Sequence, residues 1–164
     1  MPQRFENNSG YEESGYPPGM LEPGDGAPAF SLLDQHGQLV SLTDFAGRKL
    51  LVYFYPEADT PGCTVQSCAV RDARDELAAL GLDVVGISPD QPDKQLRFDQ
   101  KFDLGFPLLS DPDRAVAEAY GVRGTKWVTR SSFLIDEDGR IQEAWAKVSP
   151  KETVPKARKA LRGG

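Results

Sequence analysis

The chain has 164 residues, of which 39% are hydrophobic, and this is enough for one globular domain with its own core. Its formal net charge is −6, and its pI of about 4.8 argues against nucleic acid or an anionic membrane as a partner, because both require a basic surface. The longest apolar run, Leu50 to Tyr55, is too short to span a bilayer, and the N-terminus lacks the hydrophobic stretch of a signal peptide. We therefore expect a cytoplasmic protein.

The N-terminal part of the chain is expected to hold a tail and then a hairpin. Residues 1–20 are rich in Pro, Gly, Ser, Asn and Glu and show no apolar period, which predicts a flexible tail ahead of one domain spanning residues 21–164. The first elements of that domain are two short strands at 30–33 and 39–42, joined by the polar turn 34–37.

A strand–helix–strand unit follows. The continuous apolar runs at 50–55 and 82–88 predict two strands that are buried on both faces. Between them, from Thr64 to Leu80, apolar residues recur at helical spacing, and Gly81 ends this helix. The expected apolar face of the helix consists of Val65, Cys68, Ala69, Ala73, Leu77 and Leu80. The two strands should pair in parallel through a right-handed crossover.

The second half of the chain alternates between helical and strand patterns. In chain order we expect a helix at 93–102, a strand at 106–109, a helix at 113–120, strands at 132–136 and 140–145 around the turn Asp138-Gly139, and a basic helix from Ser149 to about Arg162. Pro155 lies inside that last helix and leaves a later start open. This order predicts an α/β fold with a mixed central sheet flanked by helices. It fits the thioredoxin fold and leaves a flavodoxin-like sheet open.

The chain has only two cysteines, Cys63 and Cys68. Cys63 follows a predicted strand and lies at the expected first turn of a helix, where free N–H groups and a partial positive charge favour a thiolate over a thiol. Pro61 suits the helix start because it loses no needed N–H there, and Thr60 places a hydroxyl near the sulfur. The alternative is that Cys63 is a small buried apolar residue.

The spacing Pro-x-x-x-Thr-x-x-Cys, here Pro56, Thr60 and Cys63, resembles the peroxidatic site of the peroxiredoxins. The extended form Thr-Pro-Gly-Cys-Thr, with a second cysteine five residues on, is similar to the bacterioferritin comigratory protein branch, also called PrxQ. The resemblance covers about residues 21–161. It implies a thioredoxin-like fold, a monomer, and a thiol peroxidase that reduces hydrogen peroxide and organic hydroperoxides.

The resemblance also assigns roles to particular residues. Thr60 would orient the peroxide, Pro56 would shield the thiol from water, and an arginine would lie beside the sulfur. That arginine corresponds to Arg130, which precedes the run Ser-Ser-Phe-Leu-Ile-Asp. An arginine suits the role because it is always charged and donates through a rigid fork. The alternatives are a plain helix N-cap for Thr60 and a strand-edge surface charge for Arg130.

Cys68 would resolve the sulfenic acid that a peroxide leaves on Cys63, and the product would be an intramolecular disulfide. In an intact helix, Cα atoms five residues apart are separated by about 8.6 Å and their side chains diverge by about 140°. A disulfide needs Cα atoms within about 7 Å, so the start of the helix must unwind. Cys68 also fits a core position on the helix. The resemblance implies thioredoxin or a similar dithiol as the reductant.

Other functions remain open. Another thioredoxin-fold disulfide oxidoreductase is disfavoured because the chain has no Cys-x-x-Cys, whereas a redox sensor could use the same site. The sequence predicts no cofactor and no metal, since one histidine, His36, and two cysteines do not complete a tetrahedral site. The preferred peroxide is also open, because many relatives carry an aromatic residue where this chain has Arg123.

Overall fold

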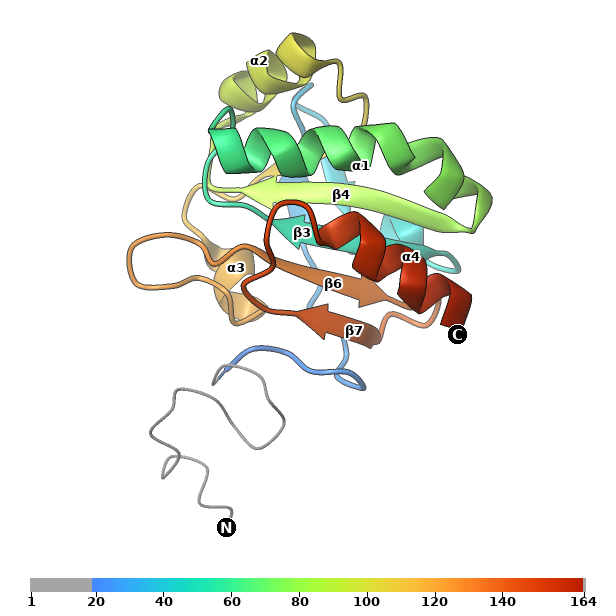
Figure 1. Cartoon of the computed structure of the whole chain (residues 1–164). Coiled ribbons are helices and arrows are strands. Elements are labelled where there is room, and N and C mark those ends of the chain that lie inside the picture. The colour runs from blue at the N-terminus through green and yellow to red at the C-terminus, as the bar shows by residue number, and fades with distance from the viewer. Residues whose placement is uncertain (1–18, 164) are drawn as a thin grey trace.

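The computed structural model of the chain describes residues 19–163, so most of the tail predicted for residues 1–20 lies outside the described residues. The elements follow the predicted order (Figure 1). The strands are β1 (Ser31–Leu33), β2 (Leu39–Ser41), β3 (Lys49–Phe54), β4 (Leu82–Ser88), β5 (Leu108–Ser110), β6 (Ser131–Ile135) and β7 (Ile141–Trp145). The helices are α1 (Pro61–Ala79), α2 (Pro92–Phe102), α3 (Ala115–Ala119) and α4 (Thr153–Gly163), with a 3-10 helix at Leu42–Phe45.

None of the helices in residues 19–163 is both long enough and apolar enough to cross a membrane.

Five strands form one mixed sheet in the order β5-β4-β3-β6-β7, which confirms the predicted fold class. β3 and β4 are parallel across the α1 connection, whereas β6 runs antiparallel to β3. Phe54, the last residue of β3, therefore pairs with Ser131, the first residue of β6. As a result, two segments meet at the same end of these strands: the loop that leads from β3 into α1, and the residue that precedes β6.

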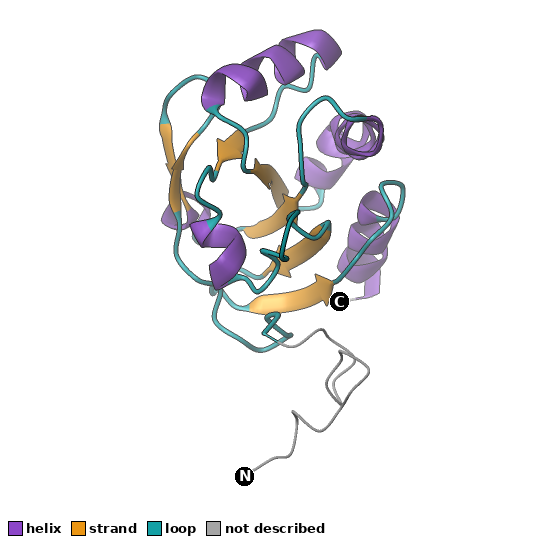
Figure 2. Cartoon of the chain, turned by 90° about the vertical axis from the view of Figure 1, so that its left-hand side faces the viewer, coloured by secondary structure: helices purple, strands orange, loops and turns teal. Residues whose placement is uncertain are grey.

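The sheet is covered on both faces, as Figure 2 shows by the helices on either side of the strands. Leu51 and Tyr53 of β3 point into the cluster shared with α1, α2 and α4, whereas Val52 and Phe54 point into the cluster shared with α3. All four side chains are fully buried. A strand with two buried faces requires an unbroken apolar run rather than an alternating one, and β3 and β4 both show this pattern.

The apolar face predicted for α1 is partly wrong. Val65 and Leu80 are 42% and 46% exposed, respectively, whereas Gln66 and Ser67 are fully buried. Both buried residues are hydrogen-bonded, and a paired polar side chain is tolerated in a core. Apolar spacing alone does not reveal a buried polar residue of this kind.

Two predicted boundaries move because of prolines. β5 begins at Leu108 rather than at 106, since Pro107 has no N–H to donate to the sheet. α4 begins at Thr153 rather than at Ser149. This start places Pro155 in the first turn of α4, where N–H groups have no partner within the helix and proline is tolerated.

Candidate active site

Cys63 is the third residue of α1 and its side chain is fully buried. α1 begins with Pro61, and its first intrahelical hydrogen bond runs from the Thr64 N–H to the Thr60 carbonyl at 2.8 Å. The N–H groups of Gly62 and Cys63 precede that bond and lie in the turn that carries the positive end of the helix dipole. The sulfur therefore lies beside the positive end of the α1 dipole, at N–H groups that have no partner within the helix.

Arg130 lies beside this sulfur. Its Nη2 donates to the Cys63 Sγ at 3.3 Å, and its Nη1 donates to the Gln66 Oε1 at 2.7 Å. Gly62 makes room for the guanidinium, because a Cβ added at Gly62 would lie 2.9 Å from the Arg130 Nη2. The planar guanidinium of Arg130 thus spans the first turn of α1 and holds its positive charge beside the Cys63 sulfur.

Thr60 and Pro56 lie in the loop between β3 and α1, and both are partly buried. The Thr60 Oγ1 donates to the Glu57 carbonyl at 2.8 Å. This bond engages the hydroxyl hydrogen and leaves the oxygen as an acceptor. Thr60 is also the N-cap residue of α1, although its side chain makes no capping hydrogen bond.

Helix α2 fixes the acidic part of this loop. Lys94 Nζ lies 2.6 Å from a carboxylate oxygen of Glu57, and Lys101 Nζ lies 3.1 Å from one of Asp59. The hydrogen bond to Glu57 is the main reason that the pKa of Lys94 is raised. The Ala58 N–H donates to Asp90 at 2.6 Å. The two carboxylates nearest to Cys63 in sequence are therefore each paired with a lysine. This pairing reduces the electrostatic repulsion between these carboxylates and a thiolate.

Two polar residues near the sulfur, Gln66 and Thr153, were not predicted from the sequence. Gln66 lies one helical turn after Cys63, and its Nε2 donates to the Thr153 Oγ1 of α4 at 2.9 Å. The Thr153 Oγ1 in turn lies 3.1 Å from the Ser132 Oγ of β6. Gln66, Ser132 and Thr153 are all at most 1% exposed. A glutamine three residues after the cysteine, on the same helix face, is the one sequence signal that could have found Gln66.

Cys68 lies on α1 and is partly buried, and both cysteines are free thiols in this structure. The adjacent Ser67 is bound to the sheet, since its Oγ lies 2.8 Å from the hydroxyl of Tyr53 on β3. Burial raises the pKa of Tyr53 well above its ordinary value, so the phenol stays neutral. The segment between the two cysteines is thus hydrogen-bonded on two sides, by Tyr53 and by Thr153.

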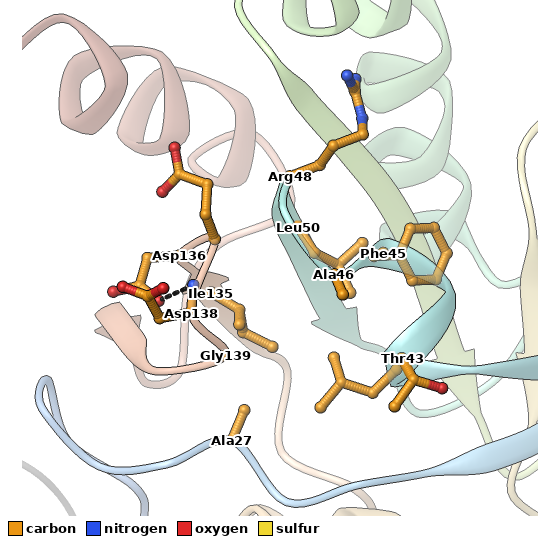
Figure 3. A pocket seen from close by; sticks show the side chains of 12 residues that line it. Ala27, Thr43, Phe45, Ala46, Arg48, Leu50, Ile135, Asp136, Asp138 and Gly139 are labelled. Atoms are coloured by element: carbon orange, nitrogen blue, oxygen red, sulfur yellow. Dashed lines mark hydrogen bonds between the residues drawn. The ribbon is translucent and has the colours of Figure 1, made fainter.

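A cavity of about 310 Å³ lies at the opposite edge of the sheet (Figure 3). It is bounded by the loop that bears Asp136 and Asp138 and by the 3-10 helix that bears Phe45. Leu50, near the start of β3, and Ile135, at the end of β6, also line it. Cys63 and Arg130 lie beyond the other ends of these two strands, so this cavity does not belong to the thiol site. Within residues 19–163, no group of three or more His, Cys, Asp or Glu side chains could hold a metal ion.

Comparisons with known proteins agree with this geometry. Residues 23–144 match the model of the AhpC/TSA family. Peroxiredoxin Bcp of Escherichia coli is 53% identical over 133 residues, which cover 76% of this chain and 85% of that protein. A putative peroxiredoxin of Mycobacterium tuberculosis is 50% identical over 149 residues, covering 86% of this chain and 95% of its own.

A solved structure is similar as well. Peroxidoxin BcpB from Mycobacterium tuberculosis superposes with a TM-score of 0.82 at 35% sequence identity. The match covers 87% of this chain and 97% of that one.

Proposed function

This chain belongs to the AhpC/TSA family and to its Bcp, or PrxQ, branch of peroxiredoxins, and we propose from that premise that it is a two-cysteine peroxidase recycled by thioredoxin or a similar dithiol. Membership of the family makes it a thiol peroxidase. The proposal adds the residues that carry the two steps, Cys63 and Cys68, and the source of electrons. We place the reaction in the cytoplasm.

The observation that carries the proposal is the 3.3 Å contact between the Arg130 Nη2 and the buried Cys63 Sγ. In the first step the thiolate attacks one peroxide oxygen, the O–O bond breaks, and the leaving oxygen takes a proton to become water or an alcohol. Arg130 stabilises the thiolate and the negative charge that develops on the peroxide. Groups of this kind contribute roughly 10²–10³-fold to rate in enzymes that stabilise an oxyanion.

The loop residues complete the first step. Because the Thr60 hydroxyl donates to the Glu57 carbonyl, its oxygen is available to accept a hydrogen bond from the peroxide O–H. The N–H groups of Gly62 and Cys63 face developing charge at the helix start. Pro56, partly buried in the same loop, shields the thiol from bulk water.

In the second step the Cys68 thiol condenses with the Cys63 sulfenic acid, which forms one S–S bond and releases water. Both residues lie on α1, so the first turns of the helix must unwind before the sulfurs meet. A reduced dithiol then attacks the disulfide, leaves as a disulfide itself and restores both thiols.

Turnover separates this function from that of a redox sensor with the same site. Reduced protein is mixed with hydrogen peroxide, thioredoxin, thioredoxin reductase and NADPH, and NADPH oxidation is followed. We expect many turnovers per molecule, and no turnover when thioredoxin is omitted. A single stoichiometric oxidation followed by no further consumption would contradict the proposal and favour the sensor.

A further inference from the structure

We propose that Thr153, from the C-terminal helix α4, is a positioning residue for the thiol site and also restrains the unwinding of α1. A chain of hydrogen bonds carries its effect. The Thr153 Oγ1 accepts from the Gln66 Nε2 at 2.9 Å, and the Gln66 Oε1 accepts from the Arg130 Nη1 at 2.7 Å. Arg130 then reaches the Cys63 Sγ at 3.3 Å through its other terminal nitrogen.

Thr153 and Arg130 together hold the Gln66 amide in one orientation. An amide carries an acceptor oxygen and a donor nitrogen, and only the oxygen suits a guanidinium, which has donors alone. Arg130 therefore takes the Gln66 Oε1, and Thr153 anchors the opposite end of the amide by accepting from the Nε2. Ser132 holds the Thr153 hydroxyl in turn, at 3.1 Å; Gln66, Ser132 and Thr153 are buried, and Arg130 is partly buried. Buried polar groups without a partner are costly, so each member of this chain constrains the next.

The same hydrogen bond opposes the second step. Gln66 lies between Cys63 and Cys68, in the segment that must leave its helical geometry before the two sulfurs meet. Its side chain cannot follow that segment and remain bonded to Thr153. Thr153 is therefore expected to have opposite effects on the two steps: it speeds the attack on peroxide and slows the formation of the disulfide.

The inference rests on the proposed function for its kinetic part, and the test includes a readout that does not. The variants are Thr153→Val, which keeps the shape and removes the hydroxyl, and Thr153→Ser, which restores it. Thr43→Val is the matched control, since Thr43 is exposed on the 3-10 helix at the other edge of the sheet. Circular dichroism and thermal unfolding establish that all three variants are folded.

Alkylation of Cys63 by iodoacetamide is measured against pH in a Cys68→Ser background, since only the thiolate reacts. We expect the midpoint of this profile to move to higher pH in Thr153→Val and to stay in place in Thr153→Ser and Thr43→Val. An unchanged profile in Thr153→Val overturns the inference. If wild-type protein failed to consume peroxide, the proposed function would fall, but this profile would still test the role of Thr153.

The two kinetic steps are then separated by quenched-flow mass spectrometry after one equivalent of hydrogen peroxide. In Thr153→Val we expect sulfenic acid to form about threefold to tenfold more slowly, a smaller loss than the roughly 10²-fold or more expected for removing a donor that touches the reacting atoms. Disulfide formation should become faster, and Thr153→Ser should restore both rates. If both steps slow together in Thr153→Val, the residue only supports the fold and the inference is wrong.

Discussion

The Arg130 Nη2 lies 3.3 Å from the Cys63 Sγ, although the two residues are 67 positions apart in the sequence. The antiparallel pairing of β3 with β6 creates this proximity, because it places the end of one strand beside the start of the other. The helix start and the arginine both favour negative charge on the sulfur. The site therefore depends on the topology of the sheet as much as on α1.

Replacement of Arg130 should slow the oxidation of Cys63 by peroxide in a graded way. Arg130→Lys keeps the charge but loses the planar fork that reaches both the sulfur and Gln66, so its rate should fall to an intermediate value. Arg130→Met should lose roughly 10²-fold or more. The second-order rate constant is measured by stopped flow in a Cys68→Ser background. A wild-type rate in Arg130→Met would show that the arginine has no part in the reaction.

The matched control is Arg97→Met. Arg97 lies on α2, and its guanidinium is 3.5 Å from Asp93 in a solvent-exposed pair. Exposed pairs of this kind contribute about 0–1 kcal/mol to stability, and we expect the rate constant to be unchanged.

Gly62→Ala should reduce the rate without unfolding the protein. The new Cβ would lie 2.9 Å from the Arg130 Nη2, so the guanidinium must move away from its position beside the sulfur. Alanine is favoured over glycine within helices by up to about 1 kcal/mol, so the thermal midpoint should not fall. Gly26→Ala is the control, because a Cβ at Gly26 meets nothing within 4 Å. Equal rates for Gly62→Ala and wild type would mean that the arginine can shift at no cost.

The strands and the fold class could be predicted from the sequence because their signals are local. The run 82–88 matches β4 residue for residue, since a strand buried on both faces leaves a continuous apolar run. The spacing from Pro56 to Cys63 is local as well, and so it could be compared directly with the peroxiredoxin motif. Arg130 came only from the resemblance, because one strand-edge arginine carries little information alone.

The supporting hydrogen bonds could not be predicted in the same way. Gln66 and Thr153 are 87 positions apart and meet only because α4 packs on α1. Apolar spacing also placed Val65 on the buried face, when the helix instead turns the polar Gln66 and Ser67 inward. Polar pairs satisfied within a core leave no periodic pattern, so they become visible only in three dimensions.

Hydrogen exchange should detect the unwinding of α1. In the reduced protein the helix runs unbroken from Pro61 to Ala79. In the disulfide form we expect the amides of residues 64–69 to exchange much faster, while those of residues 75–79 in the last turn keep their protection as an internal reference. Mass spectrometry of peptides from both redox states makes the comparison. Equal protection of residues 64–69 in the two states would rule out a local unwinding mechanism.

The contact between α1 and α4 should depend on pH through Glu76. Its carboxylate accepts from Arg158 at 2.7 and 2.8 Å, and these hydrogen bonds hold the pKa of Glu76 below its ordinary value of 4.5. A carboxyl whose pKa is lowered by folding adds stability above its unfolded pKa and loses it as the pH falls through the folded value. Glu76→Gln should therefore be less stable than wild type at neutral pH, and the difference should shrink below pH 4.5 and disappear once the pH has fallen below the folded pKa of Glu76.

Urea unfolding midpoints at several pH values check this dependence. Asp75→Asn is the control, because the Asp75 side chain is 99% exposed and lies 3.9 Å from its nearest cation. Its midpoint should follow that of wild type at every pH. A Glu76→Gln difference that persists undiminished in acid would contradict the assigned role of the carboxylate.

Peroxide consumption by reduced wild-type, Cys63→Ser and Cys68→Ser proteins, with the intact mass of each measured afterwards, tests the proposed function of the two cysteines most directly. We expect Cys63→Ser to be inactive, Cys68→Ser to gain oxygen on Cys63, and wild type to lose two hydrogen atoms as its disulfide forms. If Cys63→Ser consumes peroxide as fast as wild type, Cys63 is not the peroxidatic residue and the proposed function is wrong.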